Sequence, residues 1–319
     1  MITFENVTKQ FSDGTIAVNQ ADFSIKKGEL FVLIGPSGCG KTTTLKMMNR
    51  LIPLSEGTIY IDKRKISDYN IHELRWNIGY VLQQIALFPH MTIEENIAIV
   101  PEMKKWKESK VKKRVAELLE MVGLDPETYR NRKPNELSGG QQQRIGVIRA
   151  LAADPDIILM DEPFSALDPI SREKLQEEIV ELQKQINKTI VFVTHDIQEA
   201  LKIADRICLM KEGKVVQIGK PREFFTNPAN SFVKDFVGSA EITGGNFDLL
   251  KLVHPLSNAS SVDMFRINTD TSLKEVLDLL SEREEILVES DGTVIGKIDR
   301  LAIVNYFSGE LKEGGLKHV

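Results

Sequence analysis

A strand-like run that leads straight into a glycine-rich loop constrains this chain more than any other feature. Five consecutive apolar residues, Leu30–Ile34, precede Gly35-Pro36-Ser37-Gly38-Cys39-Gly40-Lys41-Thr42, and a helix-like segment, Thr43–Leu51, follows them. Continuous apolar runs of this length are typical of strands that are buried on both faces of a sheet. A G-x-x-x-x-G-K-[ST] spacing between such a strand and a helix predicts a loop that binds phosphate groups.

Each residue type in this loop has a chemical reason to be there. Glycines let successive backbone N–H groups face an anion, and the N-terminus of the following helix adds its dipole. Lys41 can reach the β- and γ-phosphates of a nucleotide, and the Thr42 hydroxyl can bind Mg²⁺. The strand and the helix on either side disfavour an ordinary turn. The candidate nucleotide-binding residues of this segment are Gly35, Ser37, Gly38, Cys39, Gly40, Lys41, Thr42 and Thr43.

A second candidate group lies at the end of another apolar run, Ile157–Met160, which is followed by Asp161 and Glu162. In α/β sheets, ligands bind beyond the carboxyl ends of the strands. We therefore expect Asp161 to hold Mg²⁺ through a water molecule and Glu162 to polarise the water that attacks the γ-phosphate. An acidic pair after four aliphatic residues is also a common strand end, and the phosphate-binding loop favours the catalytic interpretation.

Strands and helices alternate along the first two thirds of the chain. Residues 2–7 and 58–61 alternate between apolar and polar side chains, and Ile190–Val193 is a further buried run. Apolar stripes with helical spacing lie at residues 111–122 and 175–186. This alternation predicts an α/β layer fold.

Length and charge limit the class of protein. A chain of 319 residues predicts about two domains, and 41 basic against 46 acidic residues give a net charge of −5, which argues against broad binding of nucleic acid or anionic lipid. The two cysteines are too few for a disulfide framework, and the N-terminus does not resemble a signal peptide. The longest apolar runs are far shorter than the roughly 20 residues that cross a bilayer. We expect a soluble cytoplasmic protein that meets a membrane only through a protein partner.

The segment Leu137-Ser138-Gly139-Gly140-Gln141 opens a further predicted helix. Ser138 is a suitable N-cap and the glycines expose backbone donors, as at a second phosphate-binding helix start. This segment resembles the signature of ABC-transporter ATPases, and the phosphate-binding loop and the acidic strand end resemble the same family. The resemblance covers about residues 1–238. It implies an α/β fold with a P-loop ABC ATPase domain, which contains a helical subdomain at about residues 84–155. It also implies that this domain binds and hydrolyses ATP with Mg²⁺.

The resemblance also implies how two chains cooperate. Ser138, Gly139, Gly140 and Gln141 would complete the ATP site of the opposite protomer, so that a homodimer encloses two ATP molecules and a lone subunit hydrolyses ATP slowly. Leu87, Phe88 and Met91, taken as exposed apolar groups, would line a groove for a coupling helix of a permease. A surface helical insert is the plainer interpretation of that segment.

Four further residues receive roles from the resemblance. Phe11 would stack on adenine, Gln83 would contact Mg²⁺ and the attacking water, Asp168 would cross the dimer interface, and His195 would contact the γ-phosphate. From the residues alone, Phe11 is an ordinary apolar residue beside a turn and Asp168 begins a helix. His195 follows a buried strand and is as consistent with a structural role as with a ligand contact.

Three longer strings are similar to the ATPase subunits of importers for quaternary-amine osmoprotectants, namely glycine betaine, carnitine and choline. They are GPSGCGKTTTLKMMNRLI, IGYVLQQIALFPHMTIEENIAIVP and LSGGQQQRIGVIRALAADPDIILMDEPFSALDPI. The resemblance implies a peripheral subunit at the cytoplasmic face of the cell membrane, bound to integral-membrane permease subunits, with an extracytoplasmic substrate-binding protein or domain and no nucleic acid. ATPase subunits of polyamine, sugar or amino-acid importers remain an alternative. A non-transport ABC ATPase is disfavoured, because only about 120 residues separate the loop from the acidic strand end.

The tail differs in composition from the rest of the chain. Prolines and glycines between Asn227 and Gly245 predict a domain boundary, with a linker at residues 239–261 and a small α/β module at residues 262–319. Ser272 and Glu275 predict a capping box, and Ile286–Asp299 reads as strand, turn and strand. This stretch resembles a CBS-type regulatory module. Such modules usually occur in pairs, so the single copy leaves open whether it binds a nucleotide, senses ionic strength or only dimerises.

Overall fold

The structure is a computed structural model of the chain. It describes residues 1–84, 86–165, 169–186, 188–241, 249–254, 265–269, 271, 275–276, 279–280, 283–290 and 293–302. Asp168, Ser272 and the predicted turn at residues 291–292 lie outside this range. The chain divides into two compact units, Met1–Asp235 and Phe236–Val319, and each unit is described by itself.

A mixed six-stranded sheet forms the centre of the first unit. Its strand order is β10-β9-β3-β8-β7-β6, and only β10 runs antiparallel to its neighbour. The apolar runs predicted as buried strands become β3, β7 and β8, whose residues are all buried. The strands are β3 (Leu30–Ile34), β6 (Ile78–Val81), β7 (Ile157–Asp161), β8 (Thr189–Val193), β9 (Arg206–Lys211) and β10 (Lys214–Gly219).

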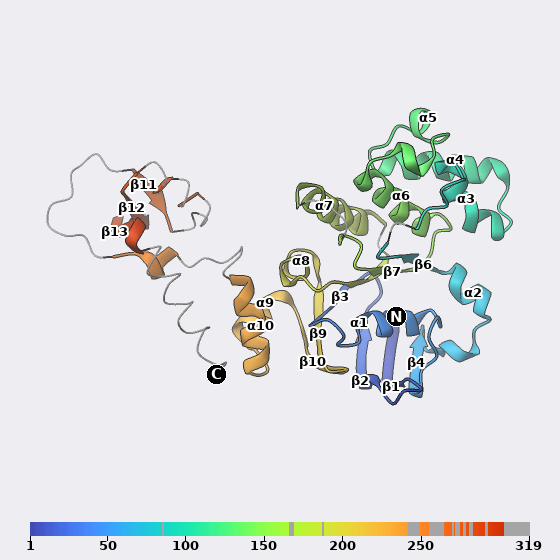
Figure 1. Ribbon diagram of the computed structural model, residues 1–319, viewed down its shortest axis with the longest axis horizontal. Helices are drawn as coiled ribbons and strands as arrows, with labels where there is room; N and C mark the ends of the chain where they lie inside the picture. The colour runs from blue at the N-terminus through green and yellow to red at the C-terminus, as the bar shows by residue number, and fades with distance from the viewer. Residues whose placement is uncertain are drawn as a thin grey trace. The chain divides into compact units, whose positions relative to one another are not determined.

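A second sheet is antiparallel and covers one side of the unit. It contains β1 (Ile2–Gln10), β2 (Ile16–Ile25), β4 (Glu56–Ile61) and β5 (Arg64–Lys65) in the order β2-β1-β4-β5. Helix α1 (Lys41–Met48) contacts β2 on one side and β7 and β8 on the other, so it lies between the two sheets (Figure 1). The stacked rings of Phe4, Phe23 and Phe31 join the sheets in one apolar core.

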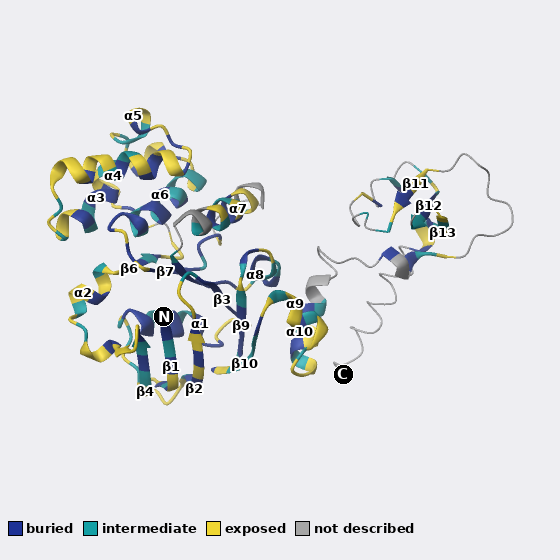
Figure 2. Cartoon of the chain, turned by 180° about the vertical axis from the view of Figure 1, so that it is seen from behind, coloured by how far each residue is buried: buried dark blue, intermediate teal, exposed yellow. Residues whose placement is uncertain are grey.

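Helix α2 (Ile71–Trp76) precedes β6, and further helices form the part of this unit between β6 and β7. The latter are α3 (Ile93–Met103), α4 (Glu108–Met121), α5 (Pro126–Tyr129) and α6 (Gly139–Leu151). The predicted apolar stripe of α4 is buried, and α4 packs against α3, α5 and α6 with its outer face exposed (Figure 2). A capping box between Thr92 and Glu95 begins α3.

The prediction that Leu87, Phe88 and Met91 are all exposed is wrong for Leu87. Leu87 is buried, Met91 is partly buried, and only Phe88 is exposed, at 45%. The Asn96 side chain accepts a 2.8 Å hydrogen bond from the Phe88 N–H and donates to the Phe88 carbonyl at 3.1 Å. These bonds fold the segment back onto α3, which turns Leu87 into the core.

The first unit ends with four more helices, and the second begins within the last of them. They are α7 (Pro169–Ile186), α8 (Ile197–Ile203), α9 (Pro221–Thr226) and α10 (Ser231–Glu241). None of the helices in the described part of the chain is long and apolar enough to cross a membrane.

The described residues of the second unit contain a small sheet with the order β11-β12-β13. Strands β12 (Glu285–Ser290) and β13 (Thr293–Asp299) pair antiparallel, as expected for the strand, turn and strand predicted at Ile286–Asp299. Strand β11 (Arg266–Asn268) pairs parallel to β12. Apolar side chains from these strands pack with Leu249, Leu252 and Val276 in a core of their own. The sheet and this core lie within the second compact unit.

Candidate active site

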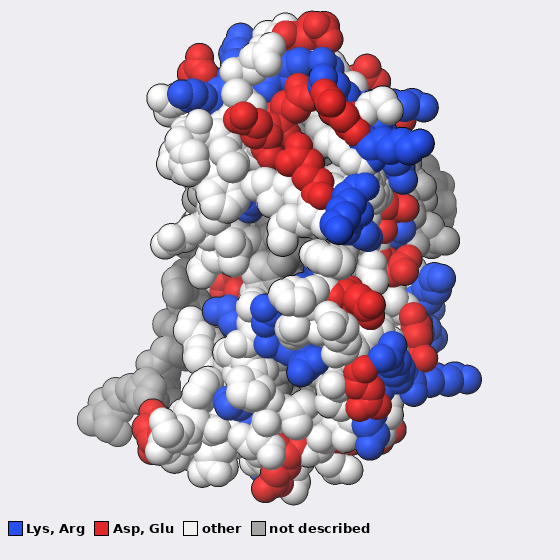
Figure 3. Space-filling model, turned by 90° about the vertical axis from the view of Figure 1, so that its right-hand side faces the viewer, with Lys and Arg blue, Asp and Glu red and all other residues white. Residues whose placement is uncertain are grey.

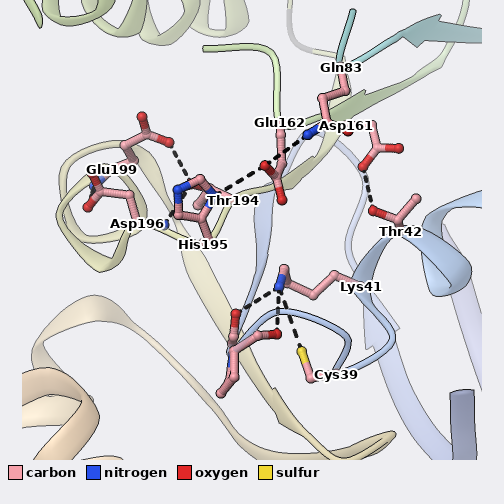
Figure 4. A network of polar contacts seen from close by, with 12 residues as sticks. Cys39, Lys41, Thr42, Gln83, Asp161, Glu162, Thr194, His195, Asp196 and Glu199 are labelled. Atoms are coloured by element: carbon pink, nitrogen blue, oxygen red, sulfur yellow. Dashed lines mark hydrogen bonds and ion pairs between the residues drawn. The ribbon is translucent and has the colours of Figure 1, made fainter. Parts of the chain in front are cut away.

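The glycine-rich loop between β3 and α1 closes around its own lysine. Lys41 is buried, and its Nζ donates hydrogen bonds to the carbonyls of Gly35 at 2.7 Å and Pro36 at 3.0 Å (Figure 4). Cys39 Sγ lies 3.8 Å from the same ammonium group. Burial raises the pKa of the Cys39 thiol, and the Lys41 charge opposes this shift. The loop therefore holds a cation at its centre, as a phosphate site requires.

Two glycines are needed for the loop to take this path. Gly35 has a φ of 148° and Gly40 a φ of 103°, values that residues with side chains rarely adopt. A Cβ atom on Gly35 would lie 2.1 Å from the Met210 carbonyl oxygen, and one on Gly40 would lie 2.1 Å from the Ala17 carbonyl oxygen. Neighbouring strands thus approach the loop so closely that only glycine fits. Gly38 also has a positive φ, of 77°, but its surroundings are open.

Thr42 and Asp161 meet at the carboxyl ends of the strands. The Thr42 hydroxyl donates a 2.8 Å hydrogen bond to Asp161 Oδ1. Tyr80, from β6, donates a 3.2 Å hydrogen bond to Asp161 Oδ2. Burial and the neighbouring Asp161 raise the pKa of Tyr80, which keeps its hydroxyl protonated as a donor. This role of Tyr80 cannot be predicted from the sequence, because strand alternation shows only which residues share a face and not which partner lies across the sheet.

Glu162 stands directly after β7 and faces two of the predicted site residues. Glu162 Oε2 accepts a 3.3 Å hydrogen bond from Gln83 Nε2 and lies 3.1 Å from His195 Nδ1 (Figure 4). These three residues come from different connections, after β6, β7 and β8. The structure thus brings together the catalytic candidates that the resemblance selected, at the same sheet edge as Thr42 and Asp161.

The backbone of Glu162 is in an unusual conformation. Its φ is 44°, in the left-handed region, and its N–H donates a 3.0 Å hydrogen bond to the Val193 carbonyl at the end of β8. Left-handed backbone at a residue with a side chain costs about 1–3 kcal/mol and is concentrated at active sites. The turn directs the Glu162 side chain toward Gln83 and His195 instead of continuing the alternation of β7.

Phe11 lies just beyond β1 and is 39% exposed. Lys9 Nζ lies 5.0 Å from the centre of the Phe11 ring, within the range of a cation–π contact. Lys9 is buried except for 9% of its surface. No sequence pattern singles out Lys9, because β1 ends at Gln10 and strand alternation does not extend to Phe11.

Ser138 caps α6 as its sequence predicts. Its hydroxyl accepts a 3.3 Å hydrogen bond from the Gln141 N–H, and Gln141 Oε1 accepts a 3.0 Å bond from the Ser138 N–H. A Cβ atom on Gly139 would meet nothing within 4 Å. Among the residues that the structure describes, no hydrogen bond of Ser138, Gly139, Gly140 or Gln141 reaches the phosphate-binding loop. The helix start is therefore open, and it is not part of the site within one chain.

Comparisons with known proteins show the family of this chain. The family model described as ABC transporter matches residues 18–165. The choline transport ATP-binding protein OpuBA of Bacillus subtilis is 51% identical over 302 residues, which cover 94% of this chain and 78% of that protein. The osmoprotectant import ATP-binding protein OsmV of Salmonella typhimurium is 46% identical over 307 residues, which cover 94% and 79% of the two proteins.

Solved structures show the same similarity. An ATP-binding cassette in a dimeric post-hydrolysis state, bound to ADP and phosphate, has a TM-score of 0.62 and 39% identity, and the match covers 70% of this chain and 99% of that one. CbiO1 of Clostridium perfringens, part of an ABC transporter complex, has a TM-score of 0.66 and 30% identity, with coverages of 76% and 94%. Relatives this similar over most of their length establish the family. This chain therefore belongs to the ABC transporter family, as an ATP-binding subunit and an ATPase.

Proposed function

We propose that this chain is the ATP-hydrolysing motor subunit of an ABC importer for quaternary-amine osmoprotectants, such as glycine betaine, carnitine or choline. The convergence of Gln83 and His195 on Glu162 supports the motor role, since it places a carboxylate and two polar side chains opposite the phosphate-binding loop. The relatives named for choline and osmoprotectant transport support the substrate class.

The phosphate-binding loop provides the binding step. Lys41 exchanges the Gly35 and Pro36 carbonyls for the β- and γ-phosphates, and Gly35, Ser37, Gly38, Cys39, Gly40 and Thr43 surround these phosphates. Phe11, with Lys9 beside it, stacks on adenine. The exposed ring and the buried lysine support this role, because a cation beside one part of the ring leaves the rest free to contact the base.

The donor set at Thr42 and Asp161 fits Mg²⁺. This ion prefers oxygen ligands, and it is usually held by one or two carboxylates together with the phosphates of the substrate. Thr42 Oγ1 and Asp161 Oδ1 lie 2.8 Å apart, and Gln83 lies at the same edge of the sheet. No group of three or more His, Cys, Asp or Glu residues that could hold a metal occurs among the described residues. When bound, Mg²⁺ would neutralise charge on the phosphates.

Glu162 polarises the attacking water in the hydrolysis step. Its carboxylate accepts a hydrogen bond from the water, Gln83 helps to orient this water, and His195 contacts the γ-phosphate. Ser138, Gly139, Gly140 and Gln141 of a second copy complete the site, and Asp168 lies at the interface between the copies. The open start of α6 supports this arrangement. ABC ATPase cassettes form dimers, as the solved post-hydrolysis structure illustrates.

The permease docks on the helical side of the first unit, at the cytoplasmic face of the membrane, and an extracytoplasmic substrate-binding protein or domain supplies the substrate. Phe88, which is 45% exposed, supports an apolar contact there. Basic and acidic side chains are mixed over the face seen in Figure 3, and acidic side chains gather on its upper part. A face of mixed charge is suited to a protein partner and not to nucleic acid.

The tail is proposed to be a single CBS-type module at residues 262–319, and Leu249 and Leu252, in the segment predicted as a linker at residues 239–261, pack in the same core. The strand order β11-β12-β13 and the separate core support an independent module. Residues 240–319 contain 14 acidic and 8 basic residues. We assign to this module a regulatory response to ionic strength.

Uptake measurements test the proposed function. The chain would be expressed with its permease and binding protein in cells that lack their own osmoprotectant importers, and uptake of labelled glycine betaine, carnitine, choline, spermidine and maltose would be compared. We expect ATP-dependent uptake of at least one quaternary amine and none in the Lys41→Ala variant. Uptake of only spermidine or maltose would refute the substrate class. Purification of the Glu162→Gln protein with ribosomes instead of a permease would refute the transport role.

A further inference from the structure

Glu199 is a buried carboxylate beside the active site to which the proposed mechanism gives no role. It lies in the first turn of α8, and only 7% of the residue is exposed. Burial of a carboxylate is unfavourable unless hydrogen bonds or opposite charges compensate for it. Desolvation raises the pKa of Glu199, while its hydrogen bond with Thr194 acts in the opposite direction. Carboxylates in such surroundings are concentrated at functional sites.

One oxygen of Glu199 fixes the connection that carries His195. The Thr194 hydroxyl donates a 2.6 Å hydrogen bond to Glu199 Oε2 and accepts a 2.9 Å bond from the Asp196 N–H. The Thr194 N–H donates to the Leu33 carbonyl at 3.2 Å, which ties the same connection to β3. Hydrogen bonds therefore fix the position of Thr194 and Asp196, the residues on both sides of His195. The His195 ring points toward Glu162 (Figure 4).

The other oxygen of Glu199 faces α7. Arg172 Nε, in the first turn of α7, lies 3.8 Å from Glu199 Oε1. A cavity of about 70 Å³, room for one or two water molecules, is lined by both catalytic candidates, Glu162 and His195, and by Arg172, Thr194 and Glu199. Glu199 thus borders the same small space as the groups that are proposed to act on the γ-phosphate.

We propose that Glu199 is a positioning residue for ATP hydrolysis, which holds His195 opposite Glu162 through Thr194 and links this connection to the start of α7 through Arg172. The inference rests on the role of His195 in the proposed function. It assigns to Glu199 no contact with ATP and no proton transfer.

A purely structural ion pair would have a different signature. Breaking it would lower the stability of the fold but leave kcat of the folded protein unchanged. Glu29 offers a matched control, because it is 6% exposed and its Oε1 lies 3.1 Å from Arg206 Nη1, before the opposite end of β3. Glu29→Gln removes a buried Glu–Arg pair of similar burial far along the strand from the site.

The first test compares variants of the full chain. Glu199→Gln keeps the size of the side chain, but its amide cannot offer an anionic oxygen to both Thr194 and Arg172. We expect kcat for ATP hydrolysis to fall about ten- to a hundredfold, as for a displaced catalytic group, with KM for ATP and Kd for ADP unchanged. Thr194→Val should lower kcat similarly, whereas Thr194→Ser retains the hydroxyl and should stay close to wild type. Glu29→Gln should leave kcat unchanged.

A double-mutant cycle shows whether Glu199 acts through His195. We expect Glu199→Gln to lower kcat in the wild-type background but not in a His195→Ala background. Thermal unfolding shows which variants are folded. If Glu199→Gln does not fold, the same cycle is measured with Thr194→Val in its place. A loss that persists in full in the His195→Ala background overturns the proposal, as does wild-type kcat in folded Glu199→Gln protein. If His195→Ala itself keeps wild-type kcat, the proposed role of His195 fails first.

Discussion

Thr42 and Asp161 are 119 positions apart in the sequence, and the Thr42 hydroxyl donates a 2.8 Å hydrogen bond to Asp161 Oδ1. Thr42 ends the phosphate-binding motif and is the second residue of α1, and Asp161 ends β7. The contact therefore joins the two sequence motifs across the carboxyl edge of the sheet, where ligands bind in this class of fold. Its two oxygens are of the kind that Mg²⁺ accepts.

The role of this pair in metal binding predicts a change in Mg²⁺ dependence. Thr42→Val preserves the shape of the side chain but removes its oxygen. We expect the Mg²⁺ concentration for half-maximal ATPase activity to rise by about tenfold or more, while nucleotide binding in EDTA is unchanged. Thr42→Ser keeps the hydroxyl and is the matched control. Equal Mg²⁺ dependence in all three proteins would exclude Thr42 as a ligand.

Removal of the Glu162 charge should separate ATP binding from hydrolysis. Glu162→Gln keeps the size of the side chain and its neighbours Gln83 and His195, so ATP should still bind. Loss of a general base lowers turnover by about 10²–10⁴-fold, and size-exclusion chromatography with ATP should show a stable dimer. Glu173→Gln, which alters a carboxylate on α7 that is 70% exposed, is the control. Wild-type turnover in Glu162→Gln would contradict the assigned role.

The close approach of Ala17 to the phosphate-binding loop predicts that Gly40 cannot be replaced. In Gly40→Ala the new Cβ would lie 2.1 Å from the Ala17 carbonyl at a φ of 103°. We expect a loss of about 2 kcal/mol or more in the free energy of unfolding, measured with urea, together with weaker ATP binding. Gly146→Ala is the control, because a Cβ there meets nothing within 4 Å and the residue lies inside α6. Equal stability of the two variants would rule out the steric explanation.

The raised pKa of Glu199 predicts a pH-dependent contribution to stability. Desolvation raises this pKa in the folded protein, so the folded state binds the proton more tightly than the unfolded chain. The contribution of Glu199 to stability is thus fully present below its ordinary pKa of about 4.3 and is lost as the pH rises through the folded value. As the pH rises over that range, the free energy of unfolding of wild type should therefore fall relative to that of Glu199→Gln. Urea titrations at several pH values measure this, and a constant difference would contradict it.

The acidic excess of the tail predicts that it responds to salt. Deletion of residues 240–319 should leave ATP-dependent transport intact at one fixed ionic strength but flatten its dependence on salt concentration, because screening acts on exposed charges. Transport in membrane vesicles at 50–500 mM KCl, about a threefold change in Debye length, compares the two proteins. If salt dependence is the same without the tail, this regulatory role is excluded.

Local patterns in the sequence were sufficient for most of the fold. Leu30–Ile34 and Ile157–Met160 are apolar at every position, which is enough to identify them as buried strands. Ser138 caps α6 as predicted, and the capping box of Thr92 and Glu95 likewise begins α3 from residues three positions apart. Helix α1, predicted at Thr43–Leu51, covers Lys41–Met48 instead, because Gly40 at a φ of 103° already forms its N-cap. These features depend on residues close in sequence.

Side chains that meet across the sheet could not be identified in the same way. Tyr80, Lys9 and Glu199 carry no motif, and each owes its place to a partner on another element. Leu87 was wrongly predicted to be exposed, because the hydrogen bonds of Asn96 that turn it inward connect residues eight positions apart.

The sequence by itself determined the class of fold and the phosphate-binding loop, because these follow from residue type and short-range spacing, whereas Gln83 and His195 received their roles only from the resemblance to the ABC family. Only the tertiary structure decided that Gln83 and His195 converge on Glu162, and that Arg172 and Thr194 both hold Glu199. Such contacts join chain segments that are distant in sequence, and their geometry is set by the order and twist of the strands that carry them.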